Sequence, residues 1–462
     1  MMTGEEYKAS LDDGRATYFG GERVTDLPGH PQLGVAVQNC ADGYDWMLDR
    51  SIEGQSPLAG VPTSPEELRA KVDLVHQSGM MSHVTYTSIM TLATVAGRMK
   101  DTTPQYIEGI QQYIDGAQSS DIRITQCITD AKGDRSKAPS KQRDPDAYVR
   151  VVDRQSDGVV IRGAKLHITG ASLGHDLMTI PTKSMKPGEE DYAIAAMVPV
   201  NAPGVKVLNT SYAPRHDDVR DFPASGTHNY PEGFVIFDDV FVPKERILLD
   251  GEVSQAAVFA HSLGLWERLG GLSSMADGAD VLVGLAQLIA EANGLAGVAH
   301  VKEKISEMII HATVVRACLE ACLVHAKTGP FGAVFPDELY TNAGKYTGAA
   351  SYHLMVRHLH DIAGGAIVTA PAIADLENPD VGELARKYMT ADPEQGDGEY
   401  RTRLFHAIRD LTADTYGGWR AVTNIQAGGG LFAQRIVTRN HYDLDRAKSM
   451  ALASAGLGDD VH

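Results

Sequence analysis

Apolar and polar positions change their spacing twice along the chain, which divides the sequence into three zones. Residues 1–124 form the first zone, and their apolar residues recur as on one face of a helix. The segment TSPEELRAKVDLVHQSG shows typical helix boundaries, with Thr63 or Ser64 as the N-cap, Pro65 in the first turn and Gly79 at the end. The first zone therefore predicts an N-terminal helical domain.

The second zone, residues 125–252, has the short runs and turn residues of β-strands. AYVRVVDRQSDGVVIRG predicts two strands around the turn Ser156-Asp157-Gly158. DYAIAAMVPV and GFVIFDDVFVPKERIL add two further strands. This zone predicts a middle β domain, either a barrel or a sandwich.

The third zone, residues 253–462, is helical again and strongly apolar. Its segment HVKEKISEMIIHATVVRACLEACLVHAKTG stops at Gly329 and carries one broad apolar stripe, formed by Ile305, Met308, Ile309, Ala312, Val315 and Leu319. We expect a C-terminal helical bundle here, and an α+β fold for the whole chain.

Composition narrows the class of protein. A formal net charge of -18 argues against nucleic acid or an anionic membrane as the main partner. Four cysteines in 462 residues do not make a disulfide framework, and the acidic start MMTGEEYKASLDDG is unlike a signal peptide. No uncharged apolar run reaches the roughly 18 residues of a membrane span. We therefore expect a cytoplasmic protein.

Two stretches of the second zone point to a ligand. VVIRGAKLHITGASLGHD begins as a strand and ends in small and hydroxylated residues with His167 and His175, which allows a ligand close to the backbone. The preceding loop CITDAKGDRSKAPSKQRD is basic within an acidic protein, through Lys132, Arg135 and others. This loop is either solvated surface or an edge that faces an anionic cofactor or thioester substrate.

Three features of the third zone are candidates for metal or ligand sites. Cys318 and Cys322 lie four residues apart on a helix, and we interpret them as core residues rather than half of a metal site. The histidines of HLMVRHLHD lack metal-ligand spacing. Gly364 and Gly365 in DIAGGAIVTAP are either a helix C-cap and turn or a backbone contact to a phosphate. We expect no metal site.

The order of the zones, together with KGDRSKAP, RGAKLHITGAS, FDDVFVP and DIAGGAIVTAP, resembles the 4-hydroxyphenylacetate 3-hydroxylase / 4-hydroxybutyryl-CoA dehydratase family. The likeness runs from EEYKASL to AQRIVTRNH, and RGAK-x-H-x-TG is its most specific part. The dehydratase branch is the more similar one. The resemblance implies the acyl-CoA dehydrogenase-like fold and FAD as the cofactor.

The resemblance also implies which residues meet the cofactor. It places along the flavin Ile128, Thr129, Asp130, Lys132, Arg135, His167, Thr169, Gly170 and Ser172. It places Gly364 and Gly365 against the FAD pyrophosphate of a neighbouring subunit. The implied assembly is a homotetramer built as a dimer of dimers.

The chain departs from the dehydratase branch at the ligands of its iron–sulfur cluster. The positions of three Cys and one His are matched by Ser82, Tyr86, Glu267 and Ser274. Because a serine hydroxyl does not replace a thiolate on iron, we expect no cluster. The hydroxylase branch also fits imperfectly: Tyr86 matches its phenol-binding Tyr, Gln126 stands at its His, and His83 is the nearest polar residue to its Arg.

Two functions follow from the resemblance. In the first, reduced FAD from a separate flavin reductase is used with O₂ to hydroxylate a small or carrier-linked substrate, and Tyr86, His83 and His175 border that substrate. In the second, FAD stays bound and acts on an acyl thioester, with Glu232 as the base at the α-carbon. We favour the monooxygenase; a non-catalytic binding role is the third alternative.

Overall fold

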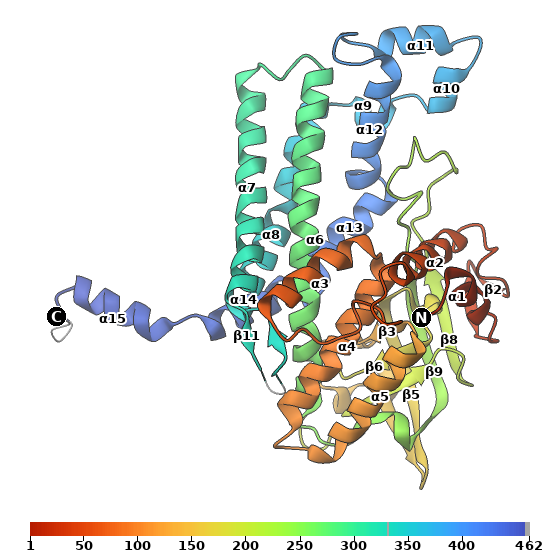
Figure 1. The fold of residues 1–462 in the computed structure, drawn as a ribbon, viewed down its shortest axis with the longest axis vertical. Helices are drawn as coiled ribbons and strands as arrows, with labels where there is room; N and C mark the ends of the chain where they lie inside the picture. The colour runs from red at the N-terminus through yellow and green to blue at the C-terminus, as the bar shows by residue number, and fades with distance from the viewer. Residues whose placement is uncertain (330–331, 458–462) are drawn as a thin grey trace.

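The computed structural model describes residues 1–329 and 332–457 (Figure 1). The N-terminal part consists of α1 (Gly4–Ser10), α2 (Gly34–Leu48), α3 (Pro65–Gln77), α4 (Met80–Met99) and α5 (Ile107–Ser120). Ser64 is the N-cap of α3, because its side chain accepts a hydrogen bond from the Glu67 amide at 3.1 Å. This confirms the helix start predicted from TSPEEL.

The middle part is a sandwich of two sheets. The six-stranded sheet has the order β2-β1-β8-β9-β5-β4, and the four-stranded sheet has the order β10-β7-β6-β3. The strand bounds are β1 (Thr17–Phe19), β2 (Glu22–Val24), β3 (Ile124–Cys127), β4 (Arg150–Arg154), β5 (Gly158–Thr169), β6 (Asp176–Thr179), β7 (Ile194–Pro199), β8 (Val205–Thr210), β9 (Glu232–Pro243) and β10 (Ile247–Asp250). Buried Val, Ile and Leu side chains of both sheets form one apolar cluster between them.

The hairpin predicted around residues 156–158 is confirmed, since β4 and β5 pair antiparallel and the Gln155 amide donates to the Gly158 carbonyl at 2.8 Å. The edge of the six-stranded sheet was not anticipated. Strand β1 lies within the first zone but pairs in parallel with β8, and β2 pairs with β1. Strands of three residues are too short to show a periodicity, so only the tertiary pairing reveals them.

The C-terminal part is dominated by three long helices, α6 (Ala256–Ala292), α7 (Ala299–Val324) and α8 (Glu338–Ala363) (Figure 1). Shorter helices follow: α9 (Ala366–Thr369), α10 (Ile373–Glu377), α11 (Gly382–Met389), α12 (Gly398–Thr412), α13 (Thr415–Gln426), α14 (Gly430–His441) and α15 (Leu444–Ser454). Helix α7 ends at Val324, before the predicted stop, because a short β11 (Lys327–Thr328) pairs with β12 (Val334–Phe335). Ile309, expected on the buried stripe, is exposed.

The helices of the N- and C-terminal parts share one core. Tyr86 and Leu92 of α4 belong to the same buried cluster as Trp266 and Leu272 of α6. Within the described residues α6 is the one helix that is long and apolar enough to cross a membrane, by length and composition. Half of its most apolar window is buried inside the protein, as is usual for the core helix of a bundle.

Cys318 and Cys322 lie on α7 as predicted for core residues, half-buried and buried respectively. The Cys322 thiol contacts the Leu319 carbonyl at 3.1 Å. Among residues 1–329 and 332–457, no group of three or more His, Cys, Asp or Glu side chains could hold a metal ion.

Candidate functional site

The two segments predicted to meet the flavin lie side by side. The Leu166 amide donates to the Thr129 carbonyl at 2.7 Å, and the Ala131 amide donates to the Ala164 carbonyl at 3.1 Å. The chain after β3 therefore runs along the end of β5 and continues its hydrogen bonding. The two segments, which are distant in the sequence, thus form one surface.

His167 lies at an irregularity of this surface. The register between β5 and β9 shifts between Lys165 and Ile168, and the His167 backbone adopts the left-handed conformation with φ of 60°. A non-glycine residue rarely takes this conformation, and such strain is concentrated at functional sites. The bulge turns His167 outward, where its side chain is exposed.

Glu232 is the most heavily hydrogen-bonded carboxylate of the site. Its carboxylate accepts from Thr169 Oγ1 at 2.9 Å, from Trp419 Nε1 at 2.9 Å and from Tyr212 OH at 3.3 Å. Glu232 begins β9, Thr169 ends β5 opposite it, and Trp419 comes from α13 of the C-terminal part. The carboxylate therefore joins the β-sandwich to the helical bundle.

Burial raises the pKa of Glu232, and the hydrogen bonds from Trp419, Thr169 and Tyr212 oppose that rise. The rings of Tyr212 and Trp419 stack with centroids 5.0 Å apart and shield the carboxylate. A partly desolvated carboxylate with a raised pKa is a stronger base than an exposed one. Neither aromatic residue was found from the sequence, since no motif links them to Glu232.

A small cavity opens beside α4 and α6. It is mainly apolar and is lined by Val72, Val75, His83, Tyr86, Thr87, Trp266, Leu269, Gly270 and Ser273. The Tyr86 hydroxyl and His83 Nδ1 are buried there without a hydrogen-bond partner among the described residues. Burial raises the pKa of Tyr86, so the hydroxyl keeps its proton and can donate it to a ligand oxygen. The structure thus brings Tyr86 and His83 to one cavity.

A chain of polar groups reaches this cavity from the β-sandwich. Gln126 Nε2 donates to Thr87 Oγ1 at 2.7 Å, and Thr87 Oγ1 donates to Glu267 Oε1 at 2.9 Å. His83 Nε2 lies 3.8 Å from the same Glu267 oxygen. A Cβ on Gly270 would stand 2.2 Å from the His83 ring, so only glycine allows this approach.

The predicted cluster-ligand positions Ser82 and Tyr86 lie on α4, next to two side chains that contact Glu267. The side chains of α4 that face Glu267 are His83 and Thr87, whereas Ser82 lies toward Gly43 of α2. A helix turns by about 100° per residue, so a shift of one position changes the face. His83 and Thr87 have the same four-residue spacing as Ser82 and Tyr86.

Asp130 and Ser172, which were predicted to lie along the flavin, are buried and have partners inside the protein. Asp130 pairs with Lys165 Nζ at 2.8 Å, each side chain being 2% exposed, and it accepts from the Val149 amide at 2.9 Å. Ser172 is fully buried and donates to Asn209 Oδ1 at 2.9 Å. With their polar atoms engaged inside the protein, neither side chain is turned toward a ligand.

Of the other predicted cofactor residues, Gly170 is buried and the rest lie nearer the surface. The partly buried ones include Ile128, Thr129 and Lys132. Arg135 is exposed in its loop. Burial and the nearby Arg135 guanidinium lower the pKa of Lys132, which shows that the two cations share one edge. Gly170 has φ of 66° and packs so closely on Met81 that a Cβ would stand 2.3 Å from its sulfur.

His175 does not lie with Tyr86 and His83. Its Nδ1 accepts from the Arg123 amide at 2.8 Å and its Nε2 contacts Ser10 Oγ at 2.8 Å. Burial, with Arg15 and Arg123 nearby, lowers the pKa of His175 to about 4. The neutral ring therefore joins the N-terminal segment to the start of β6, and its place beside the substrate stays a prediction.

We expect His175→Gln to reduce the pH dependence of the free energy of unfolding. The unfolded chain protonates this ring below its ordinary value of 6.5, whereas the folded chain resists protonation down to about pH 4. The parent should therefore lose up to about 3 kcal/mol as pH falls through this window. Urea unfolding at pH 7 and 4.5 measures the difference, with the exposed His353→Gln as control. An unchanged pH dependence in His175→Gln would contradict the structural role.

Gly364 and Gly365 lie at the end of the bundle remote from the sheets. Gly364 is the C-cap of α8, and both glycines are exposed. Figure 1 shows α9, which follows them, at the opposite end of the long helices from β5 and β9. Their contact with the FAD of a neighbouring subunit stays a prediction.

The three-part architecture is the acyl-CoA dehydrogenase-like fold, as predicted. The solved oxygenase component of 4-hydroxyphenylacetate 3-monooxygenase, complexed with FAD, superimposes with a TM-score of 0.89 at 24% identity, covering 98% of each chain. Residues 3–249 match the description "4-hydroxyphenylacetate 3-hydroxylase N terminal" and residues 256–456 match "4-hydroxyphenylacetate 3-hydroxylase C terminal". The chain belongs to the 4-hydroxyphenylacetate 3-hydroxylase family, which confirms the resemblance.

Relatives of both branches cover almost the whole chain. The 4-hydroxybutyryl-CoA dehydratase/vinylacetyl-CoA-Delta-isomerase of Clostridium aminobutyricum is 27% identical over 99% of this chain and 100% of the relative. The 4-hydroxyphenylacetate 3-monooxygenase oxygenase component of Geobacillus sp. (strain PA-9) is 24% identical over 90% of this chain and 88% of the relative. The relatives of this chain therefore include both the dehydratase and the oxygenase component.

Proposed function

We propose that this protein is the oxygenase component of a two-component flavin-dependent monooxygenase that hydroxylates a small organic substrate. The observation that carries the proposal is the unpartnered, protonated Tyr86 hydroxyl in an apolar cavity. A buried donor without a partner costs free energy unless a ligand oxygen accepts from it. A phenol or a similar oxygen-bearing ring matches an apolar wall with one donor.

FAD is the proposed cofactor, along Ile128, Thr129 and His167 and between the β-sandwich and the C-terminal helices. The exposed bulge at His167 and the cationic edge at Lys132 and Arg135 fit an anionic, planar group. Reduced FAD, supplied by a separate flavin reductase, provides the activation of O₂ when it is bound. The protein's own side chains bind and orient the substrate and exclude water.

Within this site we assign separate roles to the polar side chains. Tyr86 donates to the substrate oxygen, and His83, supported by Glu267, lies beside it in the same cavity. Glu232, held by Thr169 and Trp419, is the base that can accept a proton from the substrate carbon. Each of these roles can be tested by substitution of the single residue.

The experiment is a turnover assay with purified protein, FAD, NADH, an unrelated flavin reductase and O₂. A panel of small phenols should include at least one whose hydroxylation consumes O₂ and lowers peroxide release. A matched panel of acyl-CoA thioesters is assayed without O₂. Product from the thioesters under anaerobic conditions, and none from the phenols, would contradict the monooxygenase.

The second candidate is a flavoenzyme that acts on an acyl thioester. The observation that favours it is Glu232, since a buried carboxylate with a raised pKa suits proton removal from an α-carbon. The similarity to the dehydratase relative also supports an acyl-CoA thioester as the substrate. In this case Glu232→Gln would abolish turnover, and O₂ would be dispensable.

We also propose a homotetramer built as a dimer of dimers. In the described part of the chain, α15 buries none of its residues and extends away from the body (Figure 1). Apolar side chains are exposed on it and on α14, namely Phe432, Ile436, Met450 and Leu452. Such surface on a soluble assembly is expected to be covered by another subunit.

Gly365→Asp should lower the tetramer fraction and the FAD content together. A carboxylate at this turn would repel a pyrophosphate of the neighbouring subunit. Light scattering and flavin absorbance of the same sample measure both quantities, with Gly116→Asp on the exposed surface of α5 as the control. FAD loading in a strictly monomeric parent would overturn the arrangement.

The acidic charge and four unbridged cysteines support the cytoplasm as the location.

A further inference from the structure

The loop between β8 and β9 links Glu232 to the far helices. Thr210 and Glu232 are paired on adjacent strands, and the chain between them, residues 211–231, leaves the sheet and returns. The base of this loop is closed by Asn229 Nδ2, which donates to Ser211 Oγ at 2.9 Å. Its second residue, Tyr212, donates to the Glu232 carboxylate. A movement of the loop would therefore move the surroundings of Glu232.

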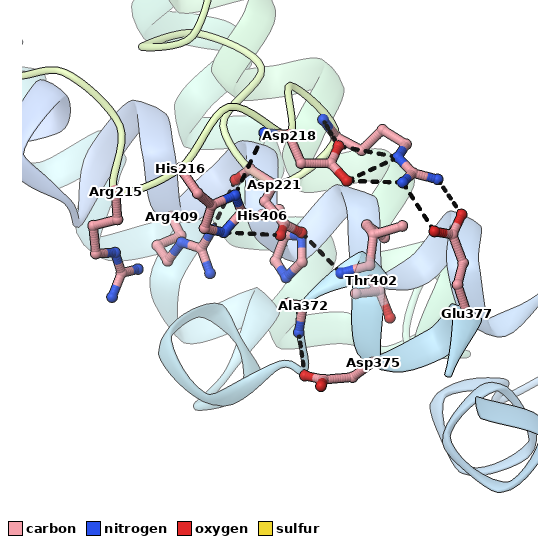
Figure 2. A network of polar contacts seen from close by, with 12 residues as sticks. Arg215, His216, Asp218, Asp221, Ala372, Asp375, Glu377, Thr402, His406 and Arg409 are labelled. Carbon is pink, nitrogen blue, oxygen red and sulfur yellow. Dashed lines mark hydrogen bonds and ion pairs between the residues drawn. The ribbon is translucent and has the colours of Figure 1, made fainter. Parts of the chain in front are cut away.

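The tip of the loop is anchored by a buried carboxylate. Figure 2 shows Asp221 pointing into the C-terminal helices, where its side chain is 2% exposed. Its Oδ1 accepts from the Ile373 amide at 3.1 Å and lies 2.7 Å from Nδ1 of the fully buried His406. His216 Nε2 lies 3.2 Å from Oδ2, and Arg409 donates to the Asp221 carbonyl at 2.7 Å.

A second carboxylate holds the returning strand of the loop. Asp410 of α12 accepts from the amides of Ala224 and Ser225, each at 2.8 Å. Asp410 lies one helical turn after His406, so both anchors come from the same helix. Helix α12 leads directly into α13, which carries the Trp419 that donates to Glu232. The tip and the base of the loop are therefore held by one continuous pair of helices.

We propose that Asp221 and His406 are positioning residues for Glu232. They fix the loop 211–231 to α12, so that Tyr212 from the loop and Trp419 from α13 close on the carboxylate from two sides. The inference rests on the proposed role of Glu232 beside the substrate. The burial of Asp221 supports it, because a carboxylate excluded from water is retained only with strong partners. A loop tip that served only as a connection would lie in solvent.

The first measurement is turnover by full-length Asp221→Asn. We expect kcat to fall ~10- to 100-fold with KM changed far less, because a base displaced by about 1 Å loses this much. Arg220→Gln is the matched control, since Arg220 lies next to Asp221 but makes exposed ion pairs with Asp218 and Glu377. That control should keep the parent's kcat.

The second measurement does not depend on turnover. Trp419 donates to Glu232, so its fluorescence should follow the ionisation of that carboxylate, and subtraction of the Trp419→Phe spectrum isolates it. The titration midpoint should lie above the ordinary carboxyl range in the parent and vanish in Glu232→Gln. Because burial is the main cause of the raised pKa, Asp221→Asn should admit water and move the midpoint to lower pH.

These outcomes separate the two proposals. If the parent gives no O₂-dependent product but Asp221→Asn still shifts the titration midpoint, the proposed monooxygenase function is wrong and the positioning role of Asp221 is retained. If Glu232→Gln lowers turnover while Asp221→Asn keeps the parent's kcat and titration midpoint, the positioning role of Asp221 is wrong. If Asp221→Asn does not fold, His406→Leu, which removes the ring nitrogen beside Asp221 and keeps an apolar side chain, is measured in the same way. A parent-like midpoint in that variant also overturns the inference.

Discussion

Replacing Tyr86 with phenylalanine should lower product formation by ~5- to 150-fold while the oxidation of reduced flavin continues. The expected range corresponds to about 1–3 kcal/mol for a buried hydrogen bond between the hydroxyl and a substrate oxygen. The substitution removes only the hydroxyl and keeps the edge-to-face contact of the ring with Trp266, whose centroid is 6.2 Å away. The fold should therefore be preserved.

The measurement compares product with peroxide in the same assay. When the substrate is held poorly, more of the O₂ consumed should leave as peroxide, so the ratio of product to peroxide falls. Tyr388→Phe is a matched control, because Tyr388 is exposed on α11 and remote from the cavity. A parent-like ratio in Tyr86→Phe would remove the main support for the proposed substrate contact.

Replacing Lys165 with methionine should destabilise the fold by about 3–5 kcal/mol. The change leaves the Asp130 carboxylate buried without its ion-pair partner, at 2% exposure. It also leaves the carbonyls of Ile128 and Ile180 without the Nζ donor that they share at 2.9 and 2.8 Å. Urea unfolding monitored by circular dichroism measures the change.

The neighbouring pair of Lys206 and Asp238 gives the control for this prediction. Its atoms are also close, at 2.7 Å, but the Lys206 side chain is 43% exposed. Lys206→Met should therefore cost at most about 1 kcal/mol. If Lys165→Met loses FAD binding but unfolds at the parent's urea concentration, Asp130 faces the cofactor after all and its structural assignment is wrong.

Local signals in the sequence were enough for much of the architecture. The Ser64 cap and the Ser156-Asp157-Gly158 turn act over three or four residues, and both were predicted correctly. The family motifs identified the two segments around Thr129 and His167 that the fold joins. Periodicity alone did not find β1 and β2, because a strand of three residues has no readable period and is held by its neighbours.

The composition of the candidate site was decided by contacts between distant parts of the chain. Trp419 lies 187 positions from the Glu232 that it contacts, and Glu267 lies 180 positions from Thr87. Lys165 lies in a strand and Asp130 in a loop, and nothing in their local sequence links them. Only the tertiary structure shows that they form a buried ion pair.

The sequence by itself therefore determined the order of the helical and β zones, the family and the two segments that are predicted to lie along the flavin. Tertiary structure alone decided that His83 and Thr87 contact Glu267. The physical reason is that turn and cap propensities act between near neighbours, whereas helix rotation and burial depend on packing across the whole chain.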